Sequence, residues 1–144
     1  MADQRMTESE RQAFLAGLHV GVLGVERGDG SPLVIPVWYS YEPGGDVIVL
    51  TSASSLKGRL VAAAGRASLC AQQEDLPYKY VSVEGTATIE QLDAEASRAA
   101  VVPMAVRYLG EELGRQYAST SVGPDDILIR LHPERWFSVD YAKT

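Results

Sequence analysis

The feature of this sequence that most limits its fold is a series of short, β-branched apolar segments separated by turn residues. Three such segments come early, at residues 19–25, 33–41 and 47–51, and the connections between them contain Gly-Asp-Gly and Pro-Gly-Gly. Short connections of this kind join antiparallel strands. The first part of the chain therefore predicts a meander of three antiparallel strands.

The rest of the chain mixes strand and helix patterns without strict alternation. Strands are predicted at 67–71 and 80–89 and, as a closing hairpin, at 127–131 and 136–141, and helices at 56–64 and, in two or three pieces with breaks at Pro103 and Gly110, at 92–117. Runs of strands with inserted helices indicate α+β or barrel architecture, because a doubly wound parallel sheet would alternate strand and helix. We expect one mainly β domain over residues 1–144, an antiparallel barrel of six or seven strands with peripheral helices.

Two local signals add detail to this architecture. Thr7 followed by Glu10 forms a capping-box pattern, which predicts a first helix that Gly17 ends. Pro36 has no amide hydrogen to donate to a sheet ladder, so the second strand is expected at a sheet edge or with a bulge at that position.

Charge and composition exclude several classes of partner. The formal net charge is −6, and no dense cluster of Lys and Arg is present of the kind that nucleic-acid phosphates require. The first ten residues lack the apolar core of a secretory signal, and every apolar run is shorter than the roughly 20 residues that span a bilayer. A single cysteine, Cys70, excludes an intrachain disulfide. We expect a cytoplasmic protein without nucleic-acid or membrane partners.

The two histidines, His19 and His132, have no Asp, Glu or Cys nearby at the spacing that metal ligands require. No metal site is therefore expected. A structural role is the favoured interpretation for both imidazoles.

The segment 51–59 combines hydroxyl groups, a helix start and two cations. The free N–H groups and dipole of a helix N-terminus favour an anion, and Lys57 and Arg59 would neutralise a phosphate. On spacing alone a simpler interpretation is favoured, in which Ser54 or Ser55 only caps the helix and the two cations are solvated.

The order of motifs between residues 14 and 90 changes this balance. The motifs are Gly21-Val22-Leu23-Gly24; Gly30-Ser31-Pro32 with Pro36-Val37-Trp38-Tyr39; Ser55-Leu56-Lys57-Gly58-Arg59-Leu60; Gly65-Arg66-Ala67-Ser68-Leu69; and the run from Pro77 to Thr86. In this order the chain resembles the pyridoxamine-phosphate-oxidase-like flavin and deazaflavin oxidoreductases. The resemblance implies a split β-barrel that forms a homodimer and holds the isoalloxazine ring in a groove between the two subunits.

The same resemblance implies a set of cofactor-binding residues. They are Ser52, Ser55, Lys57 and Arg59 around the phosphate, Ile35, Pro36, Val37 and Trp38 beside the ring, and Tyr78 and Lys79 from the partner subunit. Family members often carry Ser-Arg-Lys at the phosphate turn, whereas this sequence has Ser55-Leu56-Lys57, and Arg59 is the candidate replacement for the missing cation. Trp38 is also interpretable as a core or interface aromatic, and Lys79 as a solvated loop charge.

The function that the resemblance implies is hydride transfer between coenzyme F-420 or FMN and a small organic substrate. No catalytic side chain is expected, because the ring itself carries the hydride. The motifs around Pro36 and Pro77 resemble the deazaflavin-using branch, although an acidic chain suits its polyglutamate tail poorly. The alternatives are a non-catalytic protein that binds flavin, deazaflavin or haem, with His19 as a candidate axial ligand, and a structural barrel that serves dimerisation. Residues 92–117 are the expected source of substrate specificity.

Overall fold

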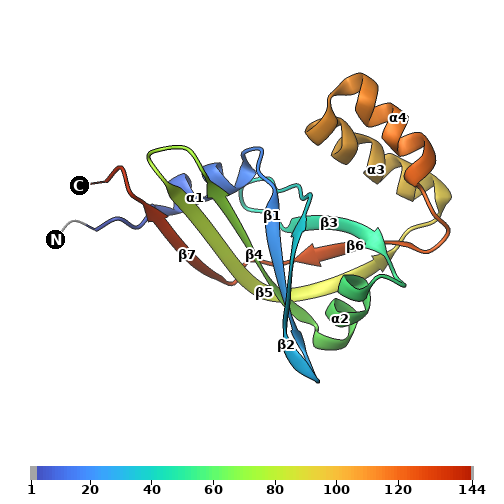
Figure 1. Ribbon diagram of the computed structural model, residues 1–144, viewed down its shortest axis with the longest axis horizontal. Coiled ribbons are helices and arrows are strands. Elements are labelled where there is room, and N and C mark those ends of the chain that lie inside the picture. The colour runs from blue at the N-terminus through green and yellow to red at the C-terminus, as the bar shows by residue number, and fades with distance from the viewer. Residues whose placement is uncertain (1–2, 144) are drawn as a thin grey trace.

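The computed structural model describes residues 3–143, which form seven strands and four helices (Figure 1). The elements are α1 (Glu8–Ala16), β1 (Gly21–Arg27), β2 (Gly30–Val37), β3 (Val47–Ser52), α2 (Leu56–Ala64), β4 (Arg66–Gln73), β5 (Lys79–Gln91), α3 (Ala94–Leu109), α4 (Glu111–Ser121), β6 (Asp126–Leu131) and β7 (Arg135–Asp140). The strands follow the order β2-β1-β4-β5-β6-β3, with β7 paired to β5, and every pairing is antiparallel. The predicted mainly β, antiparallel α+β fold is confirmed.

The longest strand, β5, is shared by two parts of the sheet. Residues 79–86 pair with β4 and residues 79–84 also pair with β7, whereas residues 87–91 pair with β6. The predicted closing hairpin between β6 and β7 is wrong, because these strands follow one another along β5 and do not pair with each other. The connection is held to β5 by backbone hydrogen bonds from His132 N to Thr86 O (2.8 Å) and from Glu134 N to Glu84 O (2.9 Å).

The predicted meander is correct for its first two strands and wrong for the third. β1 and β2 form a hairpin, and β2 lies at the sheet edge, as Pro36 required. β3 pairs with β6, and a single bridge between Ser40 and Ile48 is what joins it to the chain after β2. The β1–β2 ladder ends at the pair of Gly21 and Val37, and beyond it the Tyr39 amide donates to the Tyr108 hydroxyl (3.0 Å).

The helices follow their local signals with one exception. The Thr7 to Glu10 capping box is present, and Gly17 follows the end of α1. α3 ends before Gly110 as predicted, but it continues through Pro103, where a break was expected. Proline removes one helical hydrogen bond. Met104, which follows it, is buried, so packing holds the helix together there.

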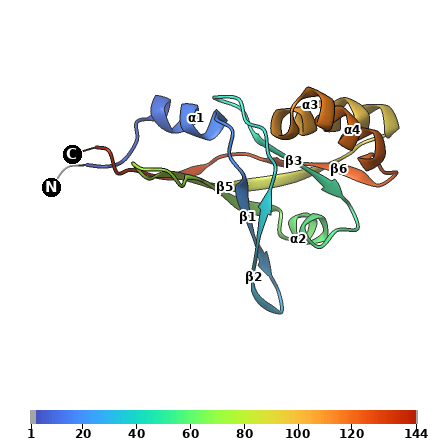
Figure 2. The same ribbon diagram turned by 45° about the horizontal axis from the view of Figure 1, so that its top comes forward.

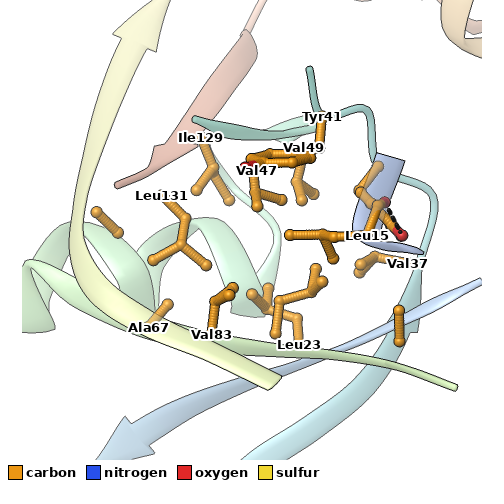
Figure 3. Close-up of a cluster of buried hydrophobic side chains, with 14 of the residues drawn as sticks. Leu15, Leu23, Val37, Tyr41, Val47, Val49, Ala67, Val83, Ile129 and Leu131 are labelled. Carbon is orange, nitrogen blue, oxygen red and sulfur yellow. Dashed lines mark hydrogen bonds between the residues drawn. The ribbon is translucent and has the colours of Figure 1, made fainter. Parts of the chain in front are cut away.

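Alternating residues of the strands point into one apolar core. Figure 3 shows Leu23, Val49 and Ile129 pointing toward one another from three strands, with Leu15 of α1 beside them. Tyr39 is fully buried in this core and donates a hydrogen bond from its hydroxyl to the Leu15 carbonyl (2.7 Å). Burial raises the pKa of this hydroxyl, which therefore stays protonated and remains a donor.

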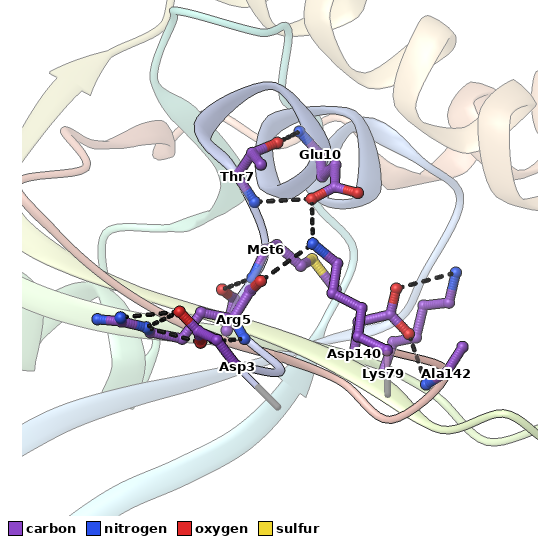
Figure 4. A network of polar contacts seen from close by, with 10 residues as sticks. Asp3, Arg5, Met6, Thr7, Glu10, Lys79, Asp140 and Ala142 are labelled. Atoms are coloured by element: carbon purple, nitrogen blue, oxygen red, sulfur yellow. Dashed lines mark hydrogen bonds and ion pairs between the residues drawn. The ribbon is translucent and has the colours of Figure 1, made fainter. Parts of the chain in front are cut away.

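Polar contacts fasten the two ends of the chain together (Figure 4). The Lys143 ammonium donates to the Glu10 carboxylate (2.6 Å) and to the Arg5 carbonyl (3.1 Å), and the Asp140 amide donates to the Gln4 carbonyl (2.8 Å). These contacts hold α1 against the end of β7. Within residues 3–143, no helix has both the length and the apolar character that crossing a bilayer requires.

Gly85 lies in β5 where the β6 to β7 connection crosses it. A Cβ atom there would lie 1.9 Å from the His132 carbonyl oxygen, so Gly85→Ala forces the backbone to move. We expect a loss of about 2 kcal/mol or more in the free energy of unfolding, measured by urea denaturation. Gly30→Ala is the matched control, since nothing lies within 4 Å of its Cβ position. Equal denaturation midpoints for the two variants would contradict the crossing geometry.

Glu10 generates a pH-dependent contribution to stability. The hydrogen bond from the Lys143 ammonium, followed by that from the Thr7 amide, lowers the pKa of its carboxyl from 4.5 to about 2. A folded-state pKa below the unfolded one stabilises the protein above pH 4.5, and the contribution disappears as the pH falls toward 2. Wild type should therefore exceed Glu10→Gln in denaturation midpoint near neutrality and converge with it in acid. A difference that stays constant over this range would refute the assignment.

Candidate functional site

A pocket of about 580 Å³ lies where the end of β2, the strands β3 and β6, and the helices α2, α3 and α4 meet. In Figure 2, α3 and α4 lie on one side of the β3 and β6 end of the sheet and α2 lies on the other. Five of the ten cofactor residues predicted from sequence line this pocket: Pro36, Val37, Trp38, Ser52 and Lys57.

One end of the pocket is polar. Ser52 of β3 and Asp126 of β6 are directly paired across the two strands, and both line the pocket. Ser97, Ser121 and Lys57 line it as well. Among residues 3–143, no carboxylate lies within 4.0 Å of the Lys57 ammonium, so its charge is not neutralised by an ion pair.

The turn between β3 and α2 positions Lys57. The Ser55 hydroxyl donates to the Ser52 carbonyl (2.7 Å) and accepts from the Gly58 amide (3.0 Å) and the Thr51 hydroxyl (3.0 Å). One donor and two acceptors are the full capacity of a hydroxyl, so Ser55 acts as the helix cap. Gly58 permits the close approach, since a Cβ atom there would lie 2.6 Å from the Ser52 carbonyl oxygen.

The other end of the pocket is aromatic and apolar. Trp38 stacks on Tyr108 with ring centroids 5.0 Å apart and lies 5.4 Å from the tilted ring of Tyr117. The Tyr108 hydroxyl also lies 2.6 Å from the His19 carbonyl oxygen, which ties the end of α3 to the chain before β1. The helical hairpin of α3 and α4 therefore fixes the orientation of Trp38.

The buried polar contact in this region joins α3 to β6. Ser97 is fully buried, and its hydroxyl donates to Oδ2 of Asp126. The same oxygen accepts a hydrogen bond from the Gly123 amide (2.9 Å). Two donors on one oxygen hold the Asp126 carboxylate in a single orientation at the pocket wall.

The other five predicted cofactor residues do not line this pocket. Ile35 packs against the core, Ser55 caps α2, and Arg59 is exposed on α2. Tyr78 and Lys79 lie beside the start of β5, where Tyr78 is 51% exposed and the Lys79 ammonium lies 3.9 Å from the Asp140 carboxylate. In Figure 1 this end of β5 is at the opposite side of the molecule from α3 and α4.

Among the residues at or beside the pocket that were not predicted as site residues are Ser97, Tyr108, Tyr117 and Asp126; of these, Tyr108 supports Trp38 without lining the pocket itself. The first three belong to the helical region that was expected to carry substrate specificity. Nothing local marks Asp126, which follows an ordinary Pro-Asp turn. Its position depends on the pairing of β6 with β3, and that pairing was not predicted.

Neither His19 nor Cys70 lines the pocket, and the surroundings of each residue disfavour a reactive role. The His19 ring stacks on Phe14 at 4.4 Å, and its Nε2 lies 3.0 Å from the Phe14 carbonyl oxygen, so this nitrogen acts as a donor. Burial raises the pKa of the Cys70 thiol, which disfavours the thiolate. Within residues 3–143, no group of three or more His, Cys, Asp or Glu side chains is arranged to hold a metal ion.

Several known proteins share this architecture. A conserved hypothetical protein from Mycobacterium tuberculosis is 26% identical, with a TM-score of 0.79 over 98% of this chain and 89% of that chain. An F-420 reductase is 22% identical, with a TM-score of 0.71 over 88% of this chain and 94% of that one. The haem storage protein HutZ from Vibrio cholerae is 19% identical, with a TM-score of 0.61 over 92% and 89% of the two chains.

The last two of these likenesses show the fold alone, because both identities are below 25%. A search of curated proteins gives no significant match. The family described as pyridoxamine 5'-phosphate oxidase matches residues 7–140, which is nearly the whole chain. Together with the antiparallel sheet of seven strands, this match shows that the chain belongs to the pyridoxamine 5'-phosphate oxidase family.

Proposed function

We propose that this protein is a flavin- or deazaflavin-dependent oxidoreductase that binds FMN or coenzyme F-420 in the pocket, with the cofactor phosphate beside Lys57. The observation that carries the proposal is the Lys57 ammonium, which lines the pocket and has no ion-pair partner within 4.0 Å among residues 3–143. A phosphate is the kind of anion that such a cation binds in charge-assisted hydrogen bonds.

The two ends of the pocket match the two parts of these cofactors. A flavin or deazaflavin joins a flat, largely apolar ring to a phosphate through a hydroxylated chain. Pro36, Val37 and Trp38 provide an apolar wall for the ring, and Ser52 and Lys57 provide polar contacts for the phosphate. Small-molecule sites commonly combine a mostly apolar lining with a few polar groups that fix orientation.

When bound, a flavin or deazaflavin supplies the hydride chemistry. The task left to the protein is to orient the ring and the small organic substrate and to exclude water from them. Trp38 is suited to the first role because Tyr108 stacks on it and holds its ring in place. No catalytic side chain is therefore required of the protein. Asp126 is the only carboxylate among the described residues that line the pocket, and it already accepts hydrogen bonds from two donors.

The proposal includes a homodimer. A row of directly paired residues crosses the outer face of five strands, in the order Pro36, Val22, Cys70, Ser82 and Phe137. None of these residues is charged, and Phe137 is 50% exposed. An uncharged row with exposed apolar side chains favours a second protein surface.

This uncharged row is continuous with the pocket, because Pro36 belongs to both. A second copy packed on this face would therefore lie beside the cofactor ring. Its Tyr78 and Lys79 are the residues proposed to reach the pocket from the partner subunit, since within one chain they lie far from it.

Haem is not part of the proposal. Nε2 of His19 faces the Phe14 carbonyl oxygen, and Nδ1 of His132 lies 2.7 Å from the Asp46 carboxylate. Neither histidine is among the residues that line the pocket.

The phosphate assignment predicts a difference between two neighbouring cations. Lys57→Ala should weaken the binding of FMN or coenzyme F-420 about tenfold or more, because it removes a charge-assisted contact. Arg59→Ala is the matched control, since Arg59 lies on the same helix but does not line the pocket. The measurement is a fluorescence titration of each variant with both cofactors. Unchanged affinity in Lys57→Ala would refute the phosphate site.

The dimer assignment predicts a sensitive position at Val22. Wild type should sediment as a species of twice the 15.6 kDa chain mass. Val22→Glu should sediment as a monomer, because a charge would be buried without a partner within the proposed interface. Leu113→Glu is the control, since Leu113 is 60% exposed on α4 and lies off this face. A monomeric wild type, or a dimer that tolerates Val22→Glu, would overturn this part of the proposal.

A further inference from the structure

The Asp126 carboxylate is held at one oxygen and free at the other. Oδ2 accepts hydrogen bonds from the Ser97 hydroxyl and the Gly123 amide. Oδ1 accepts none from residues 3–143, and it is not among the side-chain atoms that are both sealed from solvent and unpartnered. Since Asp126 lines the pocket, Oδ1 is the oxygen left to meet a ligand there.

The place of this carboxylate limits what it can bind. Asp126 is paired with Ser52 across β3 and β6, at the polar end of the pocket that also contains Lys57. It forms no ion pair within 4.0 Å with Lys57 or any other described residue. A carboxylate repels a phosphate, so the cofactor group that meets Oδ1 must be a hydrogen-bond donor.

We infer that Asp126 binds the hydroxyl groups of the cofactor's ribityl chain, an inference that rests on the proposed function. FMN and coenzyme F-420 both carry this polyol between the ring and the phosphate. The pocket contains the same three kinds of chemistry, with an apolar wall at Trp38, hydrogen-bonding groups at Asp126 and Ser52, and a cation at Lys57. Hydrogen bonds from a hydroxyl to a carboxylate are short and strong.

Ser97 acts in this scheme as a positioning residue. It is fully buried, and its hydroxyl bonds to Oδ2 of Asp126 and not to the ligand. The amide of Gly123, which precedes β6, donates to the same oxygen. A carboxylate fixed in this way accepts a hydroxyl without a large loss of side-chain entropy.

The test replaces Asp126 by asparagine and uses three ligands of one series. Asn has the same shape and can still accept from Ser97 and Gly123 through its carbonyl oxygen, but it has no charge. Asp125→Asn is the matched control, because it makes the same change one residue earlier on an exposed side chain outside the pocket. The ligands are lumiflavin, which has a methyl group in place of the ribityl chain, riboflavin, and FMN.

Asp126→Asn should weaken riboflavin and FMN about fivefold, the difference between a charge-assisted and a neutral hydrogen bond, and leave lumiflavin unchanged. Asp125→Asn should match wild type for all three. Lys57→Ala should weaken FMN but not riboflavin. If wild type binds only the deazaflavin, the corresponding deazaflavin series, with and without the ribityl chain and the phosphate, gives the same comparison.

Two results would overturn the inference while leaving the proposed function intact. An unchanged riboflavin affinity in Asp126→Asn would show that the carboxylate serves the substrate or the protein. An equal loss for lumiflavin and riboflavin would show a general disturbance of the pocket. If wild type binds neither the flavins nor coenzyme F-420, the proposed function fails, and the role of Asp126 fails with it.

Discussion

The pairing of β5 with three other strands is the constraint on which the rest of the structure depends. β4 and β7 pair with its first part and β6 with its last part, and Gly85 allows the connection between β6 and β7 to cross it closely. This arrangement places β6 beside β3, which sets Asp126 opposite Ser52. The end of β3 then leads directly into α2 and Lys57. The position of the pocket's polar end thus follows from long-range strand pairing, and the cap at Ser55 sets only its local geometry.

Lys57 at the pocket is a cation without an ion-pair partner among residues 3–143, in a protein of net charge −6. Most of the other cations near the molecular surface have carboxylate neighbours, such as Arg66 beside Glu26 at 2.6 Å and Arg115 beside Glu111 at 2.5 Å. Surface pairs of this kind contribute little to stability. A lysine at a pocket wall that has no ion-pair partner among residues 3–143 is better explained by a bound anion than by a role in the stability of the fold. Its unpaired charge therefore supports the proposed cofactor phosphate.

Local signals in the sequence predicted much of the fold, and long-range pairing accounts for the errors. The capping box at Thr7, the edge strand with Pro36 and the break at Gly110 are all present, because each depends on the chemistry of a few neighbouring residues. The third strand of the meander and the closing hairpin were wrong because the partners of β3 and β6 lie far away in the sequence. The same limit applies to the site, where Lys57 was predicted from its turn together with the family resemblance but Asp126 could not be found before its strand partner was known.

A crystal structure of the protein with FMN or coenzyme F-420 would test the central claim most directly. The account predicts the cofactor phosphate within hydrogen-bonding distance of the Lys57 ammonium, with the ring against Val37 and Trp38 and a second copy of the chain beside it. A cofactor bound elsewhere, or a phosphate that Lys57 does not contact, would contradict it.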